Sequence, residues 1–195
     1  MREIRLPVSE EDIRALKVGD EVFIAGAITT ARDAAHKFMA EHAAEETPVR
    51  DVLRNGFVYH CGPVVVKDDA GAWKIIAAGP TTSMREEPYE ATVIERFGVR
   101  GVIGKGGMGD KTLEACQRFG CAYFHAIGGL ATSLAACVTR VRGVFMSEQL
   151  GSPEAFWVID VEKFPVVVTM DAHGNSLHKE ILAASEKNLR ALLVP

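Results

Sequence analysis

Residues 89–127, "YEATVIERFGVRGVIGKGGMGDKTLEACQRFGCAYFHAI", decide the fold class. Their apolar spacing predicts helices over residues 89–98 and 111–120, and a short apolar strand follows each helix, at residues 99–104 and 121–127. Helices that alternate with strands in this way cover a sheet whose neighbouring strands run partly parallel. The stretch therefore predicts an α/β domain.

The rest of the chain is richer in strands. Further strands are predicted at residues 2–9, 21–29, 56–66, 72–79, 142–146, 157–161 and 164–170, and further helices after Ser9, over residues 31–46 with Thr30 as N-cap, over residues 130–141 and over residues 176–193. Residues 67–71 predict a hairpin turn, and full-length crossover helices are not expected among the first strands. We expect one domain over residues 1–195, a layered β/β/α fold with a mixed sheet and helices on one side.

The composition is that of an ordinary globular protein. Apolar residues make up 48% of the chain and charged residues 25%, and no apolar run approaches the roughly 18 residues that span a bilayer. The net charge of -4 argues against a nucleic-acid partner, because phosphate contacts need a basic face. The amino-terminal residues contain no apolar signal core, so we expect a cytoplasmic protein without a membrane segment.

Four cysteines, Cys61, Cys116, Cys121 and Cys137, are dispersed along the chain without a C-x-x-C pair. Their spacing is unlike that of zinc or cluster ligands, so we expect reduced and mostly buried thiols. Any metal in the working protein would then need ligands from elsewhere.

The glycine-rich stretch "GKGGMG", residues 104–109, lies between a predicted strand and a predicted helix. It matches the dinucleotide pattern G-x-G-x-x-G, but the next strand carries His125 and no carboxylate to hold a ribose. Lys105 places a cation where the backbone approaches a ligand, and amides near a helix N-terminus attract anions. We interpret the stretch as an anion site, and the alternative is a tight turn alone.

Three cations stand at predicted junctions between strands and helices, namely Arg32, Arg85 and Lys105. Such junctions are where open α/β sheets build their sites, and arginine binds carboxylates in a bidentate manner. Each cation by itself is also consistent with a solvated charge at a helix start. Together they indicate a small ligand with several negative charges, such as a dicarboxylate.

Five motifs carry a family resemblance over nearly the whole chain. They are "ITTARDAAHK" at residues 28–37, "YHCGPVV" at 59–65, "AAGPTTSMR" at 77–85, "GVIGKGGMG" at 101–109 and "DAHGN" at 171–175. In this order they resemble the β subunit, or C-terminal domain, of the class I iron–sulfur fumarases and L-tartrate dehydratases. The resemblance implies a swivelling β/β/α domain that works in a hetero-oligomer. It also implies that a separate α subunit holds a [4Fe-4S] cluster through three cysteines, and that this chain binds no metal by itself.

The resemblance also implies roles for individual residues. Arg32 and Arg85 match the residues that bind the substrate carboxylates, Lys105 and Gly106 of "KGGM" match the segment near the substrate, and Thr81 matches the proposed catalytic base. The implied reaction removes water from a 2-hydroxydicarboxylate, in which a proton leaves carbon beside a carboxylate while nearby cations stabilise the developing charge. The leaving hydroxide would need a Lewis acid, which the partner's cluster would provide.

Two neighbours of the threonine motif lead to further expectations. Thr82 is predicted to cap the helix that starts near Ser83, while Glu86 stands where methionine is common in the family and is expected to lie away from the substrate.

Malate and fumarate are the expected substrate pair, with L-tartrate as the alternative. Rival hypotheses are a phosphohistidine domain that uses His125 and a non-enzymatic assembly subunit.

Overall fold

A seven-stranded mixed sheet organises the computed structural model, which describes residues 2–45, 47 and 49–193. Its strands, in spatial order, are β1 (Arg2–Arg5), β2 (Glu21–Thr30), β3 (Phe57–Tyr59), β6 (Gly101–Gly104), β7 (Ala122–His125), β9 (Phe156–Met170) and β8 (Val138–Phe145). The first five strands in this order run parallel, and β9 runs antiparallel to both β7 and β8. The predicted α/β architecture with a mixed sheet is confirmed.

The sheet curls until β9 also pairs with β2 in antiparallel register, so β2, β3, β6, β7 and β9 form a closed ring. The short parallel strands alternate between two cores because successive side chains point to opposite faces. On β3, Phe57 and Tyr59 belong to the core inside the ring, whereas Val58 belongs to the core beneath the helices. The β/β/α layering follows from this alternation.

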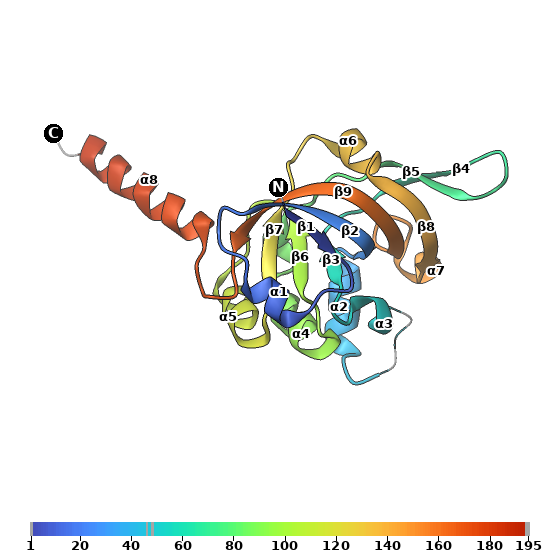
Figure 1. Ribbon diagram of the computed structural model, residues 1–195, viewed down its shortest axis with the longest axis horizontal. Helices are drawn as coiled ribbons and strands as arrows, with labels where there is room; N and C mark the ends of the chain where they lie inside the picture. Colours follow the sequence, from blue (N-terminus) through green and yellow to red (C-terminus); the bar gives the residue numbers. More distant parts are fainter. Residues whose placement is uncertain (1, 46, 48, 194–195) are drawn as a thin grey trace.

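Three helices cover the outer face of the parallel strands (Figure 1): α2 (Asp33–Glu41), α4 (Glu87–Phe97) and α5 (Asp110–Phe119). Residues Val93, Ile94 and Phe97 of α4 share one face of the helix and are buried against the sheet. Both α4 and α5 end at a glycine in the left-handed conformation, Gly98 and Gly120. These stops turn the chain directly into β6 and toward β7.

Smaller elements complete the chain. Helices α1 (Glu10–Arg14), α3 (Arg50–Leu53), α6 (Ala131–Ala135) and α7 (Ser147–Leu150), the 3₁₀ turn η1 (Ser83–Arg85) and the hairpin strands β4 (Val64–Lys67) and β5 (Trp73–Ala77) are short. The long terminal helix α8 (Leu177–Leu193) projects away from the body, as does the β4–β5 hairpin on the other side (Figure 1). Within the described residues, no helix combines the length and apolarity needed to cross a membrane.

Several predicted boundaries are wrong. The strand predicted at residues 56–66 divides into β3 and β4, and the helix predicted at residues 130–141 ends at Ala135, because the chain then enters β8. The helices predicted after Ser9 and from residue 31 are present as α1, between β1 and β2, and α2, which with α3 lies between β2 and β3. Because these strands pair in parallel, both connections are crossovers, contrary to the expectation for the first strands. The hairpin turn at residues 67–71 is confirmed, and the helix predicted after Ser9 has that serine as its N-cap.

Two further expectations need correction. The strands predicted at residues 157–161 and 164–170 are one strand, β9, in which a bulge opposite the Ile24–Gly26 step absorbs the irregular Lys163, whose φ is 50°. Thr30 is the last residue of β2 and hydrogen-bonds to Ala155 and Trp157 instead of capping α2. The predicted helix end at residue 46 lies outside the described residues, as do residues 1, 194 and 195 of the predicted domain, whose single-domain character stays a prediction.

Candidate functional site

The candidate site lies at the carboxyl ends of neighbouring parallel strands. Strand β2 leads to Arg32, β3 leads to His60 and β6 leads to Lys105. Parallel strands end at the same edge of a sheet, so residues far apart in the chain meet there. The predicted residues Arg32 and Lys105 therefore belong to one edge.

Thr81 and Lys105 are joined directly by their backbones. Thr82 and Lys105 form an isolated parallel bridge, in which the Lys105 N–H donates to the Thr81 carbonyl at 3.3 Å and the Ser83 N–H donates to the Lys105 carbonyl at 3.0 Å. The Thr81 N–H and its Oγ1 hydroxyl both donate to the His60 carbonyl, at 2.7 and 3.1 Å. The threonine motif thus adds a short extra strand beside the end of β6.

Gly106 follows Lys105 on the surface with a φ of 86°. This left-handed conformation favours glycine, and a Cβ at this position would meet nothing within 4 Å. The side chain of Lys105 lies beside Gly128, with its Cδ 3.4 Å from where a Cβ there would stand. The amides at the start of α5 are already bound, because the N–H groups of Gly109, Lys111 and Thr112 donate to the Glu87 carboxylate, so this chain's own side chain fills the anion site predicted at the helix start.

Arg32 is already paired with a carboxylate that the sequence did not suggest. Its Nε lies 3.3 Å from Oε1 of Glu154, and the two side chains are only 24% and 22% exposed. The other carboxylate oxygen of Glu154 accepts a hydrogen bond from the Ala34 N–H at 3.0 Å. Glu154 therefore connects the start of α2 to the loop after α7.

Arg85 is joined to the Arg32 loop by an ion pair with Asp33, the residue that follows Arg32. Its Nη2 lies 3.2 Å from Asp33 Oδ1, and both side chains are nearly half exposed. Burial opposes ionisation of Asp33, but Glu86 and Arg85 outweigh it and lower the pKa of that carboxyl. The structure therefore forms two groupings, Arg32 with Arg85 through Asp33, and Thr81 with Lys105 through their backbones.

Thr82 does not cap the following turn. It occupies the N-cap position of η1, but its side chain is exposed and makes no capping hydrogen bond. The prediction that Thr82 is a structural cap is wrong, because the Arg85 N–H, which a capping side chain could bind, donates to the Thr82 backbone carbonyl instead.

Glu86 is more deeply placed than expected. The residue is fully buried, and neither carboxylate oxygen has a hydrogen-bond partner in the described part of the chain. Burial, followed by the neighbouring Asp33, raises the pKa of Glu86 to about 8. A carboxyl group that stays protonated at neutral pH therefore lies directly after Arg85.

Three more side chains lie beneath the site: His36 on α2, His60 after β3 and Glu90 on α4, all fully buried. His36 and His60 belong to two of the family motifs but were given no catalytic role from the sequence, and Glu90 was not singled out. Their signal was present, since each is a polar residue at a position where the apolar pattern predicts the core. His125, the candidate phosphohistidine, is half-buried at the end of β7, and burial lowers its pKa.

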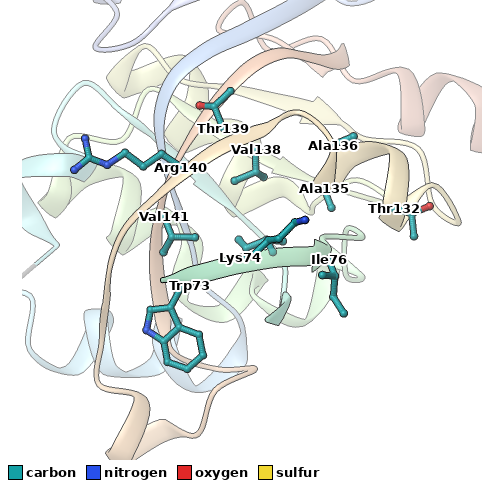
Figure 2. Close-up of a pocket in the computed structure, with 11 residues that line it drawn as sticks. Trp73, Lys74, Ile76, Thr132, Ala135, Ala136, Val138, Thr139, Arg140 and Val141 are labelled. Carbon is teal, nitrogen blue, oxygen red and sulfur yellow. The ribbon is translucent and has the colours of Figure 1, made fainter. Parts of the chain in front are cut away.

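A separate groove of about 450 Å³ lies between β5, α6 and β8, away from these residues. Figure 2 shows Trp73, Lys74 and Ile76 along β5, with Val138 and Val141 on β8 nearby. Its lining includes none of the five predicted site residues. The candidate site is therefore an open edge of the sheet that is distinct from this groove.

The chain is similar to known proteins over nearly its whole length. Residues 1–181 match the family model described as the fumarase C-terminus. A Geobacillus stearothermophilus protein with the provisional name fumarate hydratase class I is 50% identical over 192 residues, which are 98% of this chain and 36% of that protein. The chain therefore spans about a third of that relative's length.

Two relatives are named as subunits. L(+)-tartrate dehydratase subunit beta of Escherichia coli K12 is 38% identical over 175 residues, covering 89% of this chain and 85% of that protein. A Methanocaldococcus jannaschii protein with the provisional name L(+)-tartrate dehydratase subunit beta is 36% identical over 187 residues, covering 95% of both chains. On the match of residues 1–181 and these identities, the chain belongs to the fumarase C-terminus family, which includes the β subunits of class I fumarate hydratases and L(+)-tartrate dehydratases.

Proposed function

We propose that the chain is the β component of an iron–sulfur hydro-lyase that interconverts a 2-hydroxydicarboxylate and its unsaturated product, with malate and fumarate as the first candidates. The observation that carries the proposal is the pairing of Thr81 with Lys105 at the strand edge that also bears Arg32. A hydroxyl and several cations at one edge suit the removal of a proton beside a carboxylate.

Each residue has a proposed role. Arg32, Arg85 and Lys105 bind the two carboxylates and stabilise the charge that develops when the carbon loses its proton. Thr81 receives that proton through its oxygen, and because a neutral hydroxyl is too weak a base, its own hydrogen, which is directed to the His60 carbonyl in this chain, would have to pass to a base supplied by the partner. Gly106 lets the backbone approach the ligand beside Lys105. A threonine hydroxyl is a weak base, so a neighbouring group from the partner is part of this proposal.

The cluster itself is assigned to a partner α subunit, because the thiols of this chain do not suit it. Cluster ligands are thiolates, whereas burial raises the pKa of Cys61 to about 12 and also raises the pKa of Cys121. Among the described residues, the group of three ligand-type side chains that lie together is His36, His60 and Glu90, which contains no cysteine. We therefore predict a hetero-oligomer of this chain with a cluster-bearing α subunit. The cytoplasmic location is a separate prediction from the amino-terminal sequence.

L-tartrate is the second candidate substrate. Two relatives that match this chain over 85% and 95% of their own lengths carry the name L(+)-tartrate dehydratase subunit beta. Tartrate and malate differ by one hydroxyl group, and we assign the contacts to that group to the partner subunit.

The test is anaerobic reconstitution with the cluster-bearing partner, followed by assays of fumarate hydration and L-tartrate dehydration. The chain alone should be colourless and inactive. Arg32→Ala and Lys105→Ala should each lower kcat/KM by about 30-fold or more, because each removes a charged contact to a carboxylate. Lys111→Ala, on the exposed start of α5, is the matched control and should be unchanged. Activity of the isolated chain, or normal kinetics of both variants, would refute the proposal.

A further inference from the structure

A buried chain of polar side chains lies directly beneath the candidate site. Glu90 Oε2 lies 3.1 Å from His36 Nε2 and 2.9 Å from His60 Nε2. All three residues are 0% exposed. On the other side of His60, Nδ1 lies 2.8 Å from Ser83 Oγ, which in turn lies 2.8 Å from the Tyr123 hydroxyl.

The hydrogen positions along this chain follow from its partners. His36 Nδ1 lies 3.0 Å from the Arg32 carbonyl, which only accepts, so Nδ1 carries a hydrogen. Its Nε2 lies 3.1 Å from the Glu90 carboxylate, within ion-pair distance although not aligned for a hydrogen bond, and we assign it a hydrogen as well, which makes His36 an imidazolium. His60 donates from Nε2 to Glu90, so its Nδ1 accepts the Ser83 hydroxyl hydrogen.

The charges agree with this assignment. Burial alone would lower the pKa of His36, but the Glu90 carboxylate outweighs burial and raises it. Burial lowers the pKa of His60, so this second ring stays neutral. Burial also opposes ionisation of Glu90, yet His36 and His60 lower its pKa well below the usual range. One negative and one positive charge thus share a fully buried space.

This buried chain contacts the backbone of all three loops that carry site residues. His36 binds the Arg32 carbonyl, and His60 presents its own carbonyl to the N–H and hydroxyl of Thr81. Ser83 donates its N–H to the Lys105 carbonyl. The packing between Gly104 and Ser83 is tight, because a Cβ on Gly104 would lie 1.9 Å from Ser83 Oγ.

We propose that Glu90 is a positioning residue of the dicarboxylate site, which acts through His36 and His60 to hold the Arg32, Thr81 and Lys105 loops in their binding arrangement. The substrate class rests on the proposed function, whereas the positioning role does not. Replacing the Glu90 carboxylate with a neutral amide leaves His36 without its counter-ion and gives the Nε2–H of His60 a weaker acceptor. The three loops then lose their common anchor.

The test compares Glu90→Gln with Glu95→Gln, an exposed change on the same helix, in the chain and in the reconstituted complex. Glu90→Gln should fold, lose the second ring hydrogen of His36 in ¹⁵N NMR spectra, and shift the amide signals of Thr81, Lys105 and Gly106. In the complex it should lower kcat/KM for malate at least tenfold, mainly through KM. Glu95→Gln should change none of these.

The outcomes separate this proposal from the function itself. An inactive wild-type complex would count against the hydro-lyase assignment, while the NMR comparison would still decide the positioning role. Unshifted loop amides with His36 still doubly protonated in Glu90→Gln would overturn it. One tightly bound metal ion per chain, with ring nitrogens as ligands, would overturn it too. If Glu90→Gln fails to fold, Ser83→Ala, which cuts the same chain without leaving a buried charge, should show the loop shifts in weaker form.

Discussion

Arg32 Nε lies 3.3 Å from Glu154 Oε1, so an arginine proposed to bind substrate is held by a carboxylate of its own chain. We expect Glu154→Gln to tighten dicarboxylate binding by about two- to fivefold, since a partly buried ion pair of this kind contributes up to about 1 kcal/mol. Glutamine keeps an oxygen to accept the Ala34 N–H, so the start of α2 is preserved. Calorimetric titration of the reconstituted complex with malate measures the change.

Glu148→Gln is the control for this prediction. Glu148 is exposed on α7, so the change removes one negative charge away from Arg32. Equal effects of the two variants would mean that overall charge, not release of Arg32, sets the affinity. Weaker binding in Glu154→Gln would show instead that Glu154 orients Arg32 for the substrate.

The two adjacent threonines should behave differently. Thr81→Ala removes the proposed base and should reduce turnover more than tenfold while malate affinity stays nearly unchanged, because the cations remain. Thr82 is exposed and makes no capping hydrogen bond. Thr82→Ala should therefore leave turnover nearly unchanged and the free energy of unfolding within about 0.5 kcal/mol of wild type. Anaerobic kinetics and urea unfolding check both. If Thr81→Ala keeps more than a tenth of the turnover, the base is elsewhere.

The sequence predicted the site residues at the strand ends better than the buried residues beneath them. Arg32 and Lys105 were selected because they follow apolar strands, and strand ends are visible in a pattern of apolar residues. Glu154 was not, because its contact with Arg32 depends on how the loop after α7 returns to β2. Glu90 carried a usable signal, since it falls on the same helical face as Val93, Ile94 and Phe97.

The errors in the fold have a similar origin. Periodicity finds elements but not pairing, and β9 seemed to be two strands because the bulge at Lys163 interrupts its alternation. Only its continuous pairing with β2, which closes the ring, shows that it is one strand. Residues 136–141 favoured a helix locally, but pairing of β8 with β9 overrides that preference.

Helix α8 should contribute little to the stability of the chain. It has no buried residue, and Leu182 and Leu189 are 60% and 55% exposed. Leu182→Lys and Leu189→Lys should therefore leave the Tm of the chain within about 2 °C of wild type. Ile94→Lys, at a position only 1% exposed, should prevent cooperative folding. Differential scanning calorimetry measures the Tm of each variant. A large loss of Tm in either leucine variant would show that α8 packs against the rest of the chain in solution.

Glu86 should make stability fall as pH rises. Burial, followed by Asp33, raises its pKa from an ordinary 4.5 to about 8, so between these values the folded chain keeps a proton that the unfolded chain releases. The contribution is fully present below pH 4.5 and is lost as pH rises through 8. Glu86→Gln cannot ionise, so its free energy of unfolding should exceed that of wild type at pH 8, and the difference should shrink toward pH 5. Asp33 and His36 face Glu86 in both proteins, so their own titration largely cancels in the comparison. Urea unfolding at pH 5, 6, 7 and 8 measures the difference, with Glu95→Gln as the exposed control whose curve should parallel wild type. A difference between Glu86→Gln and wild type that stays constant with pH would show that Glu86 is ionised in the folded chain, and that its buried carboxylate has a partner that the present contacts do not provide.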